Sequence, residues 1–438
     1  MISNREINKL AIPAILYNIT EPLIGLADTA IIGQMSENAT FAQGGVGLAA
    51  GLISTLIWGF AQMRTALSAI ISRHFGSKTI YKIQSLIPQT LLLTLIIGLI
   101  LSLIFGTFYE KIAFFLFGTI DNLTLKFSND YFSLRCIGIP IGLLVALFFG
   151  IFRGFQNTTW AMYIGITGGI INIILDFILV IGIDNYVDPL GVKGAAMASV
   201  VSQIIMLSLC IYVFIKKTPF KVFYSRNLNP YFKEMISIFI NMFLRTIVLN
   251  IVFIISNRFA NSYGKFELAA YTIGYNIWIF TSFFIDGYSN AGNALAGKYL
   301  GQNDNEKLSK LGNKLLKINI QISLILVIIY TIFYTKIGKL FNNDSEVIMY
   351  FNTTFWIVII AQPFNAIAFT FDGIFKGLGR AVDLRNTLTV ATFIVFIPVI
   401  YLLDFITANS FCIWVALSLW MIYRGMSLLL KFKKILAN

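Results

Sequence analysis

The stretch that decides the fold is short and occurs twice. Residues 150–154 read Gly-Ile-Phe-Arg-Gly, and residues 373–377 read Gly-Ile-Phe-Lys-Gly, 223 positions further along the chain. At the same offset Pro140 matches Pro363, ten residues before each stretch. Self-similarity at a fixed offset is typical of a duplicated structural unit. The match therefore predicts that the chain contains two copies of one fold.

A second repeated stretch supports the duplication. Residues 71–76 read Ile-Ser-Arg-His-Phe-Gly and residues 296–301 read Ala-Gly-Lys-Tyr-Leu-Gly, so a basic residue and a glycine recur at an offset of 225. We predict a first lobe over residues 1–215 and a second lobe over residues 232–438. The polar stretch 216–231 between them is expected to be a cytoplasmic linker.

The composition places both copies in a membrane. Hydrophobic residues make up 57% of the chain and charged residues only 12%, whereas soluble domains carry about 25% charged residues. A spanning helix needs roughly 20 mostly apolar residues. Twelve stretches qualify, near 10–34, 43–71, 86–106, 131–152, 160–183, 194–215, 235–257, 268–296, 318–335, 351–375, 386–403 and 408–429. We predict an all-α polytopic membrane protein of twelve transmembrane helices in two pseudo-symmetric six-helix lobes.

Lysine and arginine are distributed asymmetrically. Of the 33 basic residues, 23 fall at the termini or in loops after even-numbered helices, and 7 fall in loops after odd-numbered helices. Cytoplasmic loops carry such an excess, so we expect both termini in the cytoplasm and the protein in a bacterial inner membrane. The same bias accounts for the net charge of +13 without a nucleic-acid partner.

Motifs for enzymatic chemistry are absent from the sequence. There is no Walker A pattern (G-x-x-x-x-G-K-[ST]), so ATP hydrolysis by this chain is not expected. His74 is the single histidine, and Cys136, Cys210 and Cys412 lack metal-ligand spacing. We predict a monomeric protein that is not an enzyme, needs no cofactor, and has the lipid bilayer and small amphipathic molecules as its partners.

We single out seven ionisable residues within the predicted spans. Charged side chains are costly in a bilayer and mark functional sites by default. The acidic ones are Glu21, Asp28, Asp176, Asp286 and Asp372, and the basic ones are Arg64 and Arg245. Each carboxylate is a candidate for an ion or substrate site. The two arginines are candidate counter-ions, and the alternative for Arg64 is to snorkel toward the cytoplasm. The alternative for each carboxylate is a structural ion pair or a hydrogen bond between helices.

The carboxylates of the first copy are spaced along common helix faces. Glu21 and Asp28 are seven residues apart in the first span, and Asn172 and Asp176 are four apart in the fifth. A carboxylate in apolar surroundings can take up a proton, because desolvation disfavours its charged form. The same oxygens could hold Na⁺, since hard cations prefer oxygen ligands. The pattern leaves both ions open.

The two copies do not share these charges. Asp28 aligns with Val252, and Asp372 aligns with Phe149. This asymmetry favours an ion site in the first lobe at Asp28 and Asp176. The charges of the second lobe would then shape the substrate cavity.

Proline interrupts the first predicted helix at Pro13 and Pro22. Proline removes a backbone donor and kinks a helix, so a bend there could couple protonation of Asp28 to the shape of the cavity. Transmembrane helices also contain proline without any gating role. The residues that we assign to the substrate cavity or to gating are Pro13, Pro22, Glu21, Arg245, Asp286 and Asp372.

Several motifs, in this order and spacing, resemble one transporter family. They are Asn18-Ile-Thr-Glu-Pro-Leu-Ile-Gly-Leu-Ala-Asp-Thr-Ala-Ile-Ile-Gly33, Arg153-Gly-Phe-Gln-Asn-Thr158, Asn172-Ile-Ile-Leu-Asp176, Gly191-Val-Lys-Gly-Ala-Ala-Met-Ala-Ser199 and Asp372-Gly-Ile-Phe-Lys-Gly377. The chain is similar to the multidrug and toxic compound extrusion (MATE) transporters, in particular to their DNA-damage-inducible F branch. The similarity covers nearly the whole chain, including its length and its duplication.

The resemblance implies export of organic cations or other amphipathic compounds in exchange for H⁺ or Na⁺. It places the ion site of the first lobe at Asp28, Asn172, Asp176, a hydroxyl that here is Ser199, and the neighbouring Asn157. In this branch Pro13 matches the proline proposed to bend on protonation. The sodium-binding branch carries a glutamate in its seventh helix, where this chain has Arg245, and this departure favours the first-lobe site.

The predicted function is therefore that of an antiporter. An ion would neutralise Asp28 and Asp176, the first helix would rearrange and release the substrate outward, and the lobes would rock inward. One rival is a flippase of the same superfamily that moves lipid-linked or isoprenoid cargo. An ion channel is a more distant rival, because the asymmetric charges do not form a symmetric pore lining.

Overall fold

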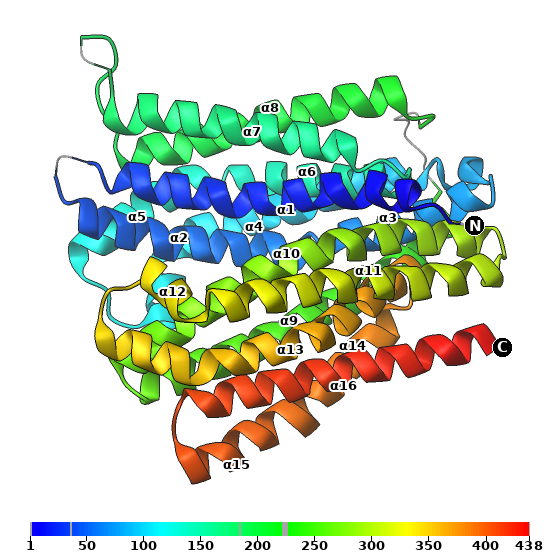
Figure 1. The fold of residues 1–438 in the computed structure, drawn as a ribbon. Helices are drawn as coiled ribbons and strands as arrows, with labels where there is room; N and C mark the ends of the chain where they lie inside the picture. The colour runs from blue at the N-terminus through cyan, green and yellow to red at the C-terminus, as the bar shows by residue number, and fades with distance from the viewer. Residues whose placement is uncertain (1, 36, 184, 221–226, 438) are drawn as a thin grey trace. The chain divides into compact units, whose positions relative to one another are not determined.

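The computed structural model describes residues 2–35, 37–183, 185–220 and 227–437, and the side chain of Glu21 also lies outside the description. Figure 1 follows the helices along the chain. The first half contains α1 (Asn4–Ile32), α2 (Ala39–Phe60), α3 (Met63–Gly76), η1 (Ile80–Ile83), α4 (Leu86–Phe117), α5 (Asn122–Arg135), α6 (Gly138–Gly154), α7 (Thr159–Asp176), η2 (Phe177–Ile181) and α8 (Val192–Lys217). The second half contains α9 (Phe232–Ser262), α10 (Lys265–Gly301), α11 (Asn305–Ile332), α12 (Tyr334–Ile337), η3 (Gly338–Leu340), α13 (Ser345–Gly377), α14 (Ala381–Val390), η4 (Ala391–Phe396), α15 (Ile397–Thr407) and α16 (Ser410–Ala437).

The described helices are long and apolar enough to cross a membrane. Eleven spans qualify by length and composition among the described residues, and the bent pair α5–α6 makes a twelfth. The spans also expose apolar side chains, as a lipid-facing helix does. On α4, for example, Leu92, Leu99 and Leu103 are all exposed. The predicted all-α fold class with twelve membrane helices is confirmed.

The fourth span is broken, and a proline follows the break. α5 ends at Arg135, α6 begins at Gly138, and the two helices meet at an angle of 55°. Pro140 lies in the first turn of α6, where its missing N–H costs no intrahelical hydrogen bond. Its repeat partner Pro363 lies inside the unbroken helix α13. The duplicated sequences have therefore diverged in shape at this point.

The chain forms two compact units. Unit 1 comprises residues 1–15, 68–78 and 236–438, and unit 2 comprises residues 16–67 and 79–235. In unit 1, α10, α13 and α16 pack together around a core that includes Trp414 and Trp420. In unit 2, α2 packs on α5, and α8 packs on α5, α6 and α7. The lobe boundaries deduced from the repeat stay a prediction.

Equivalent glycines make equivalent contacts in the two copies. A Cβ atom placed on Gly150 would lie 2.8 Å from Arg64 Cα, and one placed on Gly373 would lie 2.7 Å from the Ser289 carbonyl carbon. The two glycines are repeat partners at the offset of 223, and Arg64 and Ser289 are 225 positions apart. The same glycine therefore brings the same pair of helices into backbone contact in each copy, which supports the duplication.

The second repeated stretch shows its own symmetry inside unit 1. Gly76 packs against the carbonyl oxygen of Lys298, and Gly301 packs against the carbonyl oxygen of Arg73. Gly76 and Gly301 are repeat partners, and so are Arg73 and Lys298. Such reciprocal contacts are the mark of a two-fold crossing. The ends of α3 and α10 thus cross each other at equivalent positions, and only glycine fits there.

The described end of the linker is fixed within unit 2. The Asn229 amide nitrogen Nδ2 donates to the Lys82 carbonyl oxygen and to Ser85 Oγ, at 2.9 Å each. The backbone N–H of Asn229 donates to Gln89 Oε1 at 3.0 Å. These bonds attach the end of the linker to η1 and the beginning of α4. Residues 221–226 of the predicted linker lie outside the described residues.

Candidate functional site

The first candidate site begins at the end of α7 in unit 2. Asp176 is the last residue of this helix and is 0% exposed. The π-helical turn η2 follows it directly, and such turns are frequent at functional sites. Asn172 lies one turn earlier on the same face and is also buried. Both oxygens of Asp176 and both amide atoms of Asn172 are buried with no hydrogen-bond partner among the described residues.

Asp28 of α1 joins this group. It is an electrostatic neighbour of Asp176, and its Oδ1 is likewise buried without a partner among the described residues. An ionised carboxylate can only accept hydrogen bonds, and two adjacent negative charges repel each other. The pair is therefore incomplete without a proton or another cation. Together with the Asn172 amide oxygen, the two carboxylates form an oxygen-rich set that suits H⁺ or a hard cation such as Na⁺.

Two residues of this site were not singled out from the sequence. Arg135, at the break between α5 and α6, acts electrostatically on both Asp28 and Asp176. Tyr131, one turn earlier, is buried beside Arg135 and is an electrostatic neighbour of Asp28. The signal for Arg135 was its place in an apolar span, because intramembrane cations are functional candidates by default. Tyr131 carries no comparable sequence signal.

Arg135 is held by α8. Its Nη1 donates to Gln203 Oε1 at 3.1 Å, while its Nε is buried without a partner among the described residues. A Cβ atom on Gly138 would lie 2.5 Å from Gln203 Oε1 and 2.8 Å from Arg135 Nη1. The glycine at the start of α6 therefore provides the space in which this bond forms.

The structure brings together only some of the site residues that the family resemblance implies. Ser199 of α8 is buried next to Tyr131, and thus within the same group. Asn157 does not lie within this group. It precedes the other end of α7, about 28 Å along the helix from Asp176. There its Oδ1 accepts hydrogen bonds from the backbone N–H groups of Thr159 and Trp160 at 3.0 and 3.3 Å. Asn157 thus makes its hydrogen bonds at the start of α7, and its assignment to the ion site stays a prediction.

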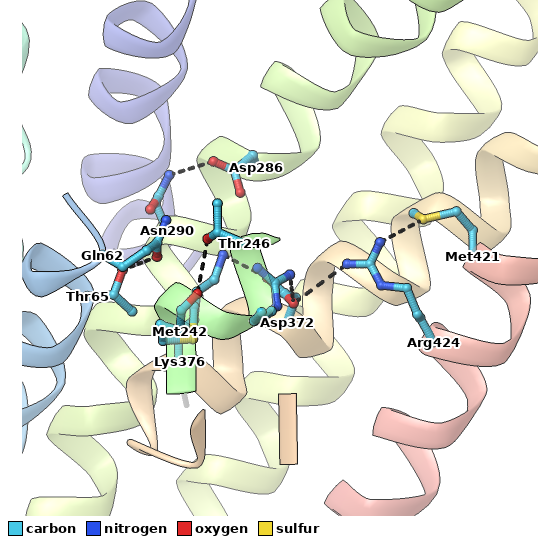
Figure 2. Close-up of polar contacts among 11 residues, drawn as sticks. Gln62, Thr65, Met242, Thr246, Asp286, Asn290, Asp372, Lys376, Met421 and Arg424 are labelled. Atoms are coloured by element: carbon cyan, nitrogen blue, oxygen red, sulfur yellow. Dashed lines mark hydrogen bonds and ion pairs between the residues drawn. The ribbon is translucent and has the colours of Figure 1, made fainter. Parts of the chain in front are cut away.

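The second candidate site is a charged cluster in unit 1, drawn in Figure 2. Arg245 Nη2 of α9 lies 2.6 Å from Asp372 Oδ1, and Lys376 Nζ lies 2.7 Å from Asp372 Oδ2. Arg424 Nη2 of α16 lies 3.8 Å from Asp372 Oδ1 (Figure 2). Asp372 on α13 is thus surrounded by three cations. Asp372 and Arg245 are predicted from the sequence, and Arg424 is not.

The remaining predicted residues belong to α10 and α1. Asp286 of α10 accepts a hydrogen bond of 3.0 Å from Asn290 Nδ2, one turn along the same helix (Figure 2). Pro13 and Pro22 both lie inside α1, which is one continuous helix over its described length. The boundary between the two units crosses α1 between Ile15 and Leu16, two residues after Pro13. Glu21 is predicted as a site residue, but its side chain is outside the described residues.

A family model called MatE matches residues 13–178 and 242–402, one segment in each copy. The chain belongs to the MatE family. Members of the MatE family are multi-pass membrane transporters of small molecules that use ion gradients; they are not enzymes and need no cofactor. The predicted family resemblance and the prediction that this chain is not an enzyme are confirmed.

Curated MatE relatives match most of the chain. It is 23% identical to the DNA damage-inducible protein F of Escherichia coli (strain K12), over 97% of this chain and 91% of that protein. It is 24% identical to the probable multidrug resistance protein NorM of Thermotoga maritima, over 86% of this chain and 81% of the relative. The match to Protein DETOXIFICATION 42 of Arabidopsis thaliana, at 26% identity, covers 70% of this chain but only 58% of the plant protein's length.

Solved MatE structures share the fold. One described as MATE in the bent conformation superposes with a TM-score of 0.91 at 18% identity, over 99% of this chain and 95% of that one. An outward-facing multidrug resistance MATE family transporter gives a TM-score of 0.88 at 19% identity, with the same coverage. At this level of identity the likeness establishes the fold alone.

Proposed function

We propose that this MatE protein is a secondary active antiporter that exports amphipathic organic compounds in exchange for H⁺ or Na⁺. The observation that carries the proposal is the set of unpartnered oxygens at Asp28, Asn172 and Asp176 in unit 2. Buried polar groups are normally hydrogen-bonded, and leaving several carboxylate oxygens without donors is costly. An exchangeable cation at this site supplies the missing partner.

Some of the site residues bind the ion, and others set the affinity with which it is bound. Asp28 and Asp176 supply the negative charge, and the Asn172 amide oxygen adds a neutral ligand or acceptor. Arg135 opposes cation binding, because it places a positive charge near both carboxylates. A weakened site releases its ion, which an exchanger must do in every cycle. Ser199 and Tyr131 complete the polar lining of the group.

Coupling requires that the ion and the cargo favour different conformations. α1 is the element suited to link them, since it carries Asp28 in unit 2 and Pro13 in unit 1. Neutralising Asp28 changes the interactions of one half of this helix. Proline weakens the helical hydrogen-bond ladder near the point where the units divide. We propose that ion binding is transmitted along α1 in this way.

The two rival functions, flippase and channel, require different structural features from an antiporter. A flippase for lipid-linked or isoprenoid cargo would also use the MatE-like scaffold, but it does not need a cation site in unit 2. A channel would conduct ions without exchanging cargo. The unpartnered carboxylate pair in one unit favours the antiporter over both. Bacterial inner-membrane location and a monomeric state belong to the same proposal.

Transport in proteoliposomes tests the proposal. A panel of amphipathic dyes is loaded, and efflux is recorded under a pH gradient alone and under a Na⁺ gradient alone. We expect one gradient to drive efflux in the wild type and Asp28→Asn to abolish the driven component. Asp130→Asn, which removes a carboxylate of the same unit paired at 3.5 Å with Lys193, is the control. Full gradient-driven efflux by Asp28→Asn would refute the assignment of the site.

A further inference from the structure

A short motif recurs where the third span of each copy ends. Residues 108–112 read Phe-Tyr-Glu-Lys-Ile and residues 333–337 read Phe-Tyr-Thr-Lys-Ile, at the same offset of 225 as the second repeated stretch. The two copies differ in the charges of the ion site, yet they share this motif. The motif therefore has a role that the ion site does not explain.

The helix is interrupted at the phenylalanine of each motif. Phe108 has φ −110° and ψ 18°, and Phe333 has φ −97° and ψ 12°. These non-helical values lie in a sparsely populated region of backbone conformation. α4 continues beyond Phe108 to Phe117, and α12 and η3 follow Phe333. The same backbone feature thus separates a short segment from the end of a span in each unit.

The span before each interruption is long enough to cross the membrane. α4 has 32 residues and α11 has 28, which correspond to about 48 and 42 Å, whereas the hydrocarbon core of a bilayer is about 30 Å thick. These helices are the third and ninth spans, whose ends the predicted topology places on the outer side. Residues 108–117 and 333–340, which we call the outer segments, therefore belong at the membrane surface.

The tyrosine of each motif fixes its outer segment to the unit that carries it. Tyr109 is 1% exposed and forms a hydrogen bond with the Ser128 hydroxyl of α5. The Tyr334 hydroxyl donates to the carbonyl oxygen of Asn352 in α13. Ser128 and Asn352 are themselves repeat partners, at an offset of 224. Packing inside each unit therefore accounts for the tyrosine.

Packing does not account for the exposed side chains that also repeat. In each outer segment an apolar residue, a lysine and a second apolar residue are exposed, at intervals of three and then four positions. The first set is Phe108, Lys111 and Phe115, and the second is Phe333, Lys336 and Leu340. Phe115 is 87% exposed and Leu340 is 81% exposed. We call these two sets the outer stripes.

We propose that the outer stripes dock on the outer surface of the lipid bilayer, with their apolar side chains at the boundary between headgroups and acyl chains and their lysines against lipid phosphates. On α4 the stripe continues the exposed apolar side chains Leu99 and Leu103 of the span itself. A short segment that is anchored on one side and apolar on the other suits this boundary.

The chemistry of the stripes favours lipid over other occupants. A lysine packs its hydrocarbon stem on apolar surface while its ammonium group reaches a polar layer. Lys111 Nζ lies 5.9 Å from the centre of the Phe108 ring, so the charge and the apolar surface are adjacent. Every span ends at the bilayer surface. One partner therefore explains why the stripe occurs in both copies.

Depth-dependent fluorescence quenching tests the proposal. Full-length Phe115→Cys and Leu340→Cys are labelled with an NBD fluorophore and reconstituted in vesicles of phosphatidylcholine and phosphatidylglycerol. The native cysteines are buried, and wild-type protein taken through the same labelling gives the background. We expect lipid that carries a doxyl group near its headgroup to quench both labels about two-fold more strongly than lipid with the doxyl group deep in its acyl chain. Iodide in the water should quench them weakly.

Matched variants separate docking from general proximity to the membrane. Asn122→Cys and Asn343→Cys label exposed polar residues a few positions beyond each outer segment, and iodide should quench them more strongly than either lipid does. Lys111→Glu should reduce shallow-doxyl quenching at residue 115, because lipid phosphates repel a carboxylate. Glu110→Gln should not reduce it. An unchanged signal in Lys111→Glu would refute the contact between lysine and phosphate.

Three results would overturn the proposal. Iodide quenching of both stripe labels as strong as in the controls would place the stripes in water. Shielding from iodide and from both lipids would place them against protein, such as a second copy of this chain. Stronger quenching by the deep doxyl group would make them part of the spans. Each copy is tested separately, so one variant that fails to fold leaves the other decisive. The measurement needs neither an ion gradient nor cargo, and its outcome is independent of the proposed antiport.

Discussion

The reciprocal crossing of α3 and α10 in unit 1 makes a quantitative prediction about two glycines. A Cβ atom on Gly76 would overlap the Lys298 carbonyl oxygen, and one on Gly301 would overlap the Arg73 carbonyl oxygen. Backbone cannot rotate aside as a flexible side chain does. Gly76→Ala or Gly301→Ala must therefore push the two segments apart by about 1 Å, and overpacking of this kind costs about 1–3 kcal/mol.

The helical gain from alanine reduces that cost. Replacing glycine by alanine at an unstrained helical position stabilises a protein by about 0.4–1 kcal/mol. We therefore expect each variant to lose roughly 1–2 kcal/mol in the free energy of unfolding. Both substitutions demand the same separation of the same two segments. The double variant should consequently lose less than the sum of the single losses, by at least about 0.5 kcal/mol.

Equilibrium unfolding in mixed SDS–detergent micelles, followed by tryptophan emission, measures these free energies. Gly51→Ala in α2 is the control, because a Cβ atom there meets nothing within 4 Å, and it should leave stability unchanged or raise it by up to about 1 kcal/mol. Unchanged stability of Gly76→Ala and Gly301→Ala would show that the crossing is not formed. Strict additivity would show that the two contacts are not one reciprocal interface.

Three further predictions concern unit 2. Asn157→Ala should destabilise the start of α7 by about 0.5–2 kcal/mol, which faster local hydrogen exchange would reveal. Dye efflux should be unchanged. Loss of ion-coupled efflux in this variant would instead place Asn157 in the ion site. Arg135→Gln removes a cation acting on both carboxylates, so the ion concentration for half-maximal exchange should fall about three-fold or more; a rise would contradict this. The N–H groups of Thr124 and Leu123 hold the pKa of Asp121 below its usual range. The stability that ionised Asp121 gives to the start of α5 is therefore fully present above the pKa of Asp121 in the unfolded chain. It is lost as the pH falls through the lower pKa of Asp121 in the folded protein. Hydrogen exchange at the start of α5, corrected for intrinsic rates, should accelerate in acid. It should also accelerate in Asp121→Asn at neutral pH.

The fold was accessible from the sequence because membrane helices are encoded by composition. Long apolar runs need no tertiary information to be recognised, and the offset of Gly150 from Gly373 revealed the duplication directly. The break at Arg135 was not predicted. The sequence predicts one span over residues 131–152, while Pro363, in the equivalent region, lies in an unbroken helix. The bend depends on packing, which the pattern does not contain.

The candidate site was predicted where residues share a helix and missed where they meet across helices. The spacing of Asn172 and Asp176 placed both on one face, and the intramembrane charge of Asp28 marked it as a candidate. Tyr131 and Arg135 belong to α5 and meet these residues across helices. Arg424 lies near the end of the predicted span 408–429 and was grouped with the basic residues of the C-terminus, where a charged side chain is usually solvated. Its burial against Met421 and Trp420 arises from the packing of α16 in unit 1.

The most direct test of the ion site uses Asp176→Asn, which preserves the size and polarity of the side chain and removes its charge. Purified protein is reconstituted into proteoliposomes, and dye movement is measured twice, once under the driving H⁺ or Na⁺ gradient and once as dye-for-dye exchange without a gradient. We predict that Asp176→Asn loses gradient-driven accumulation and keeps dye exchange, whereas Asp130→Asn keeps both. Accumulation at the wild-type level in Asp176→Asn would contradict the assignment of coupling to this carboxylate pair.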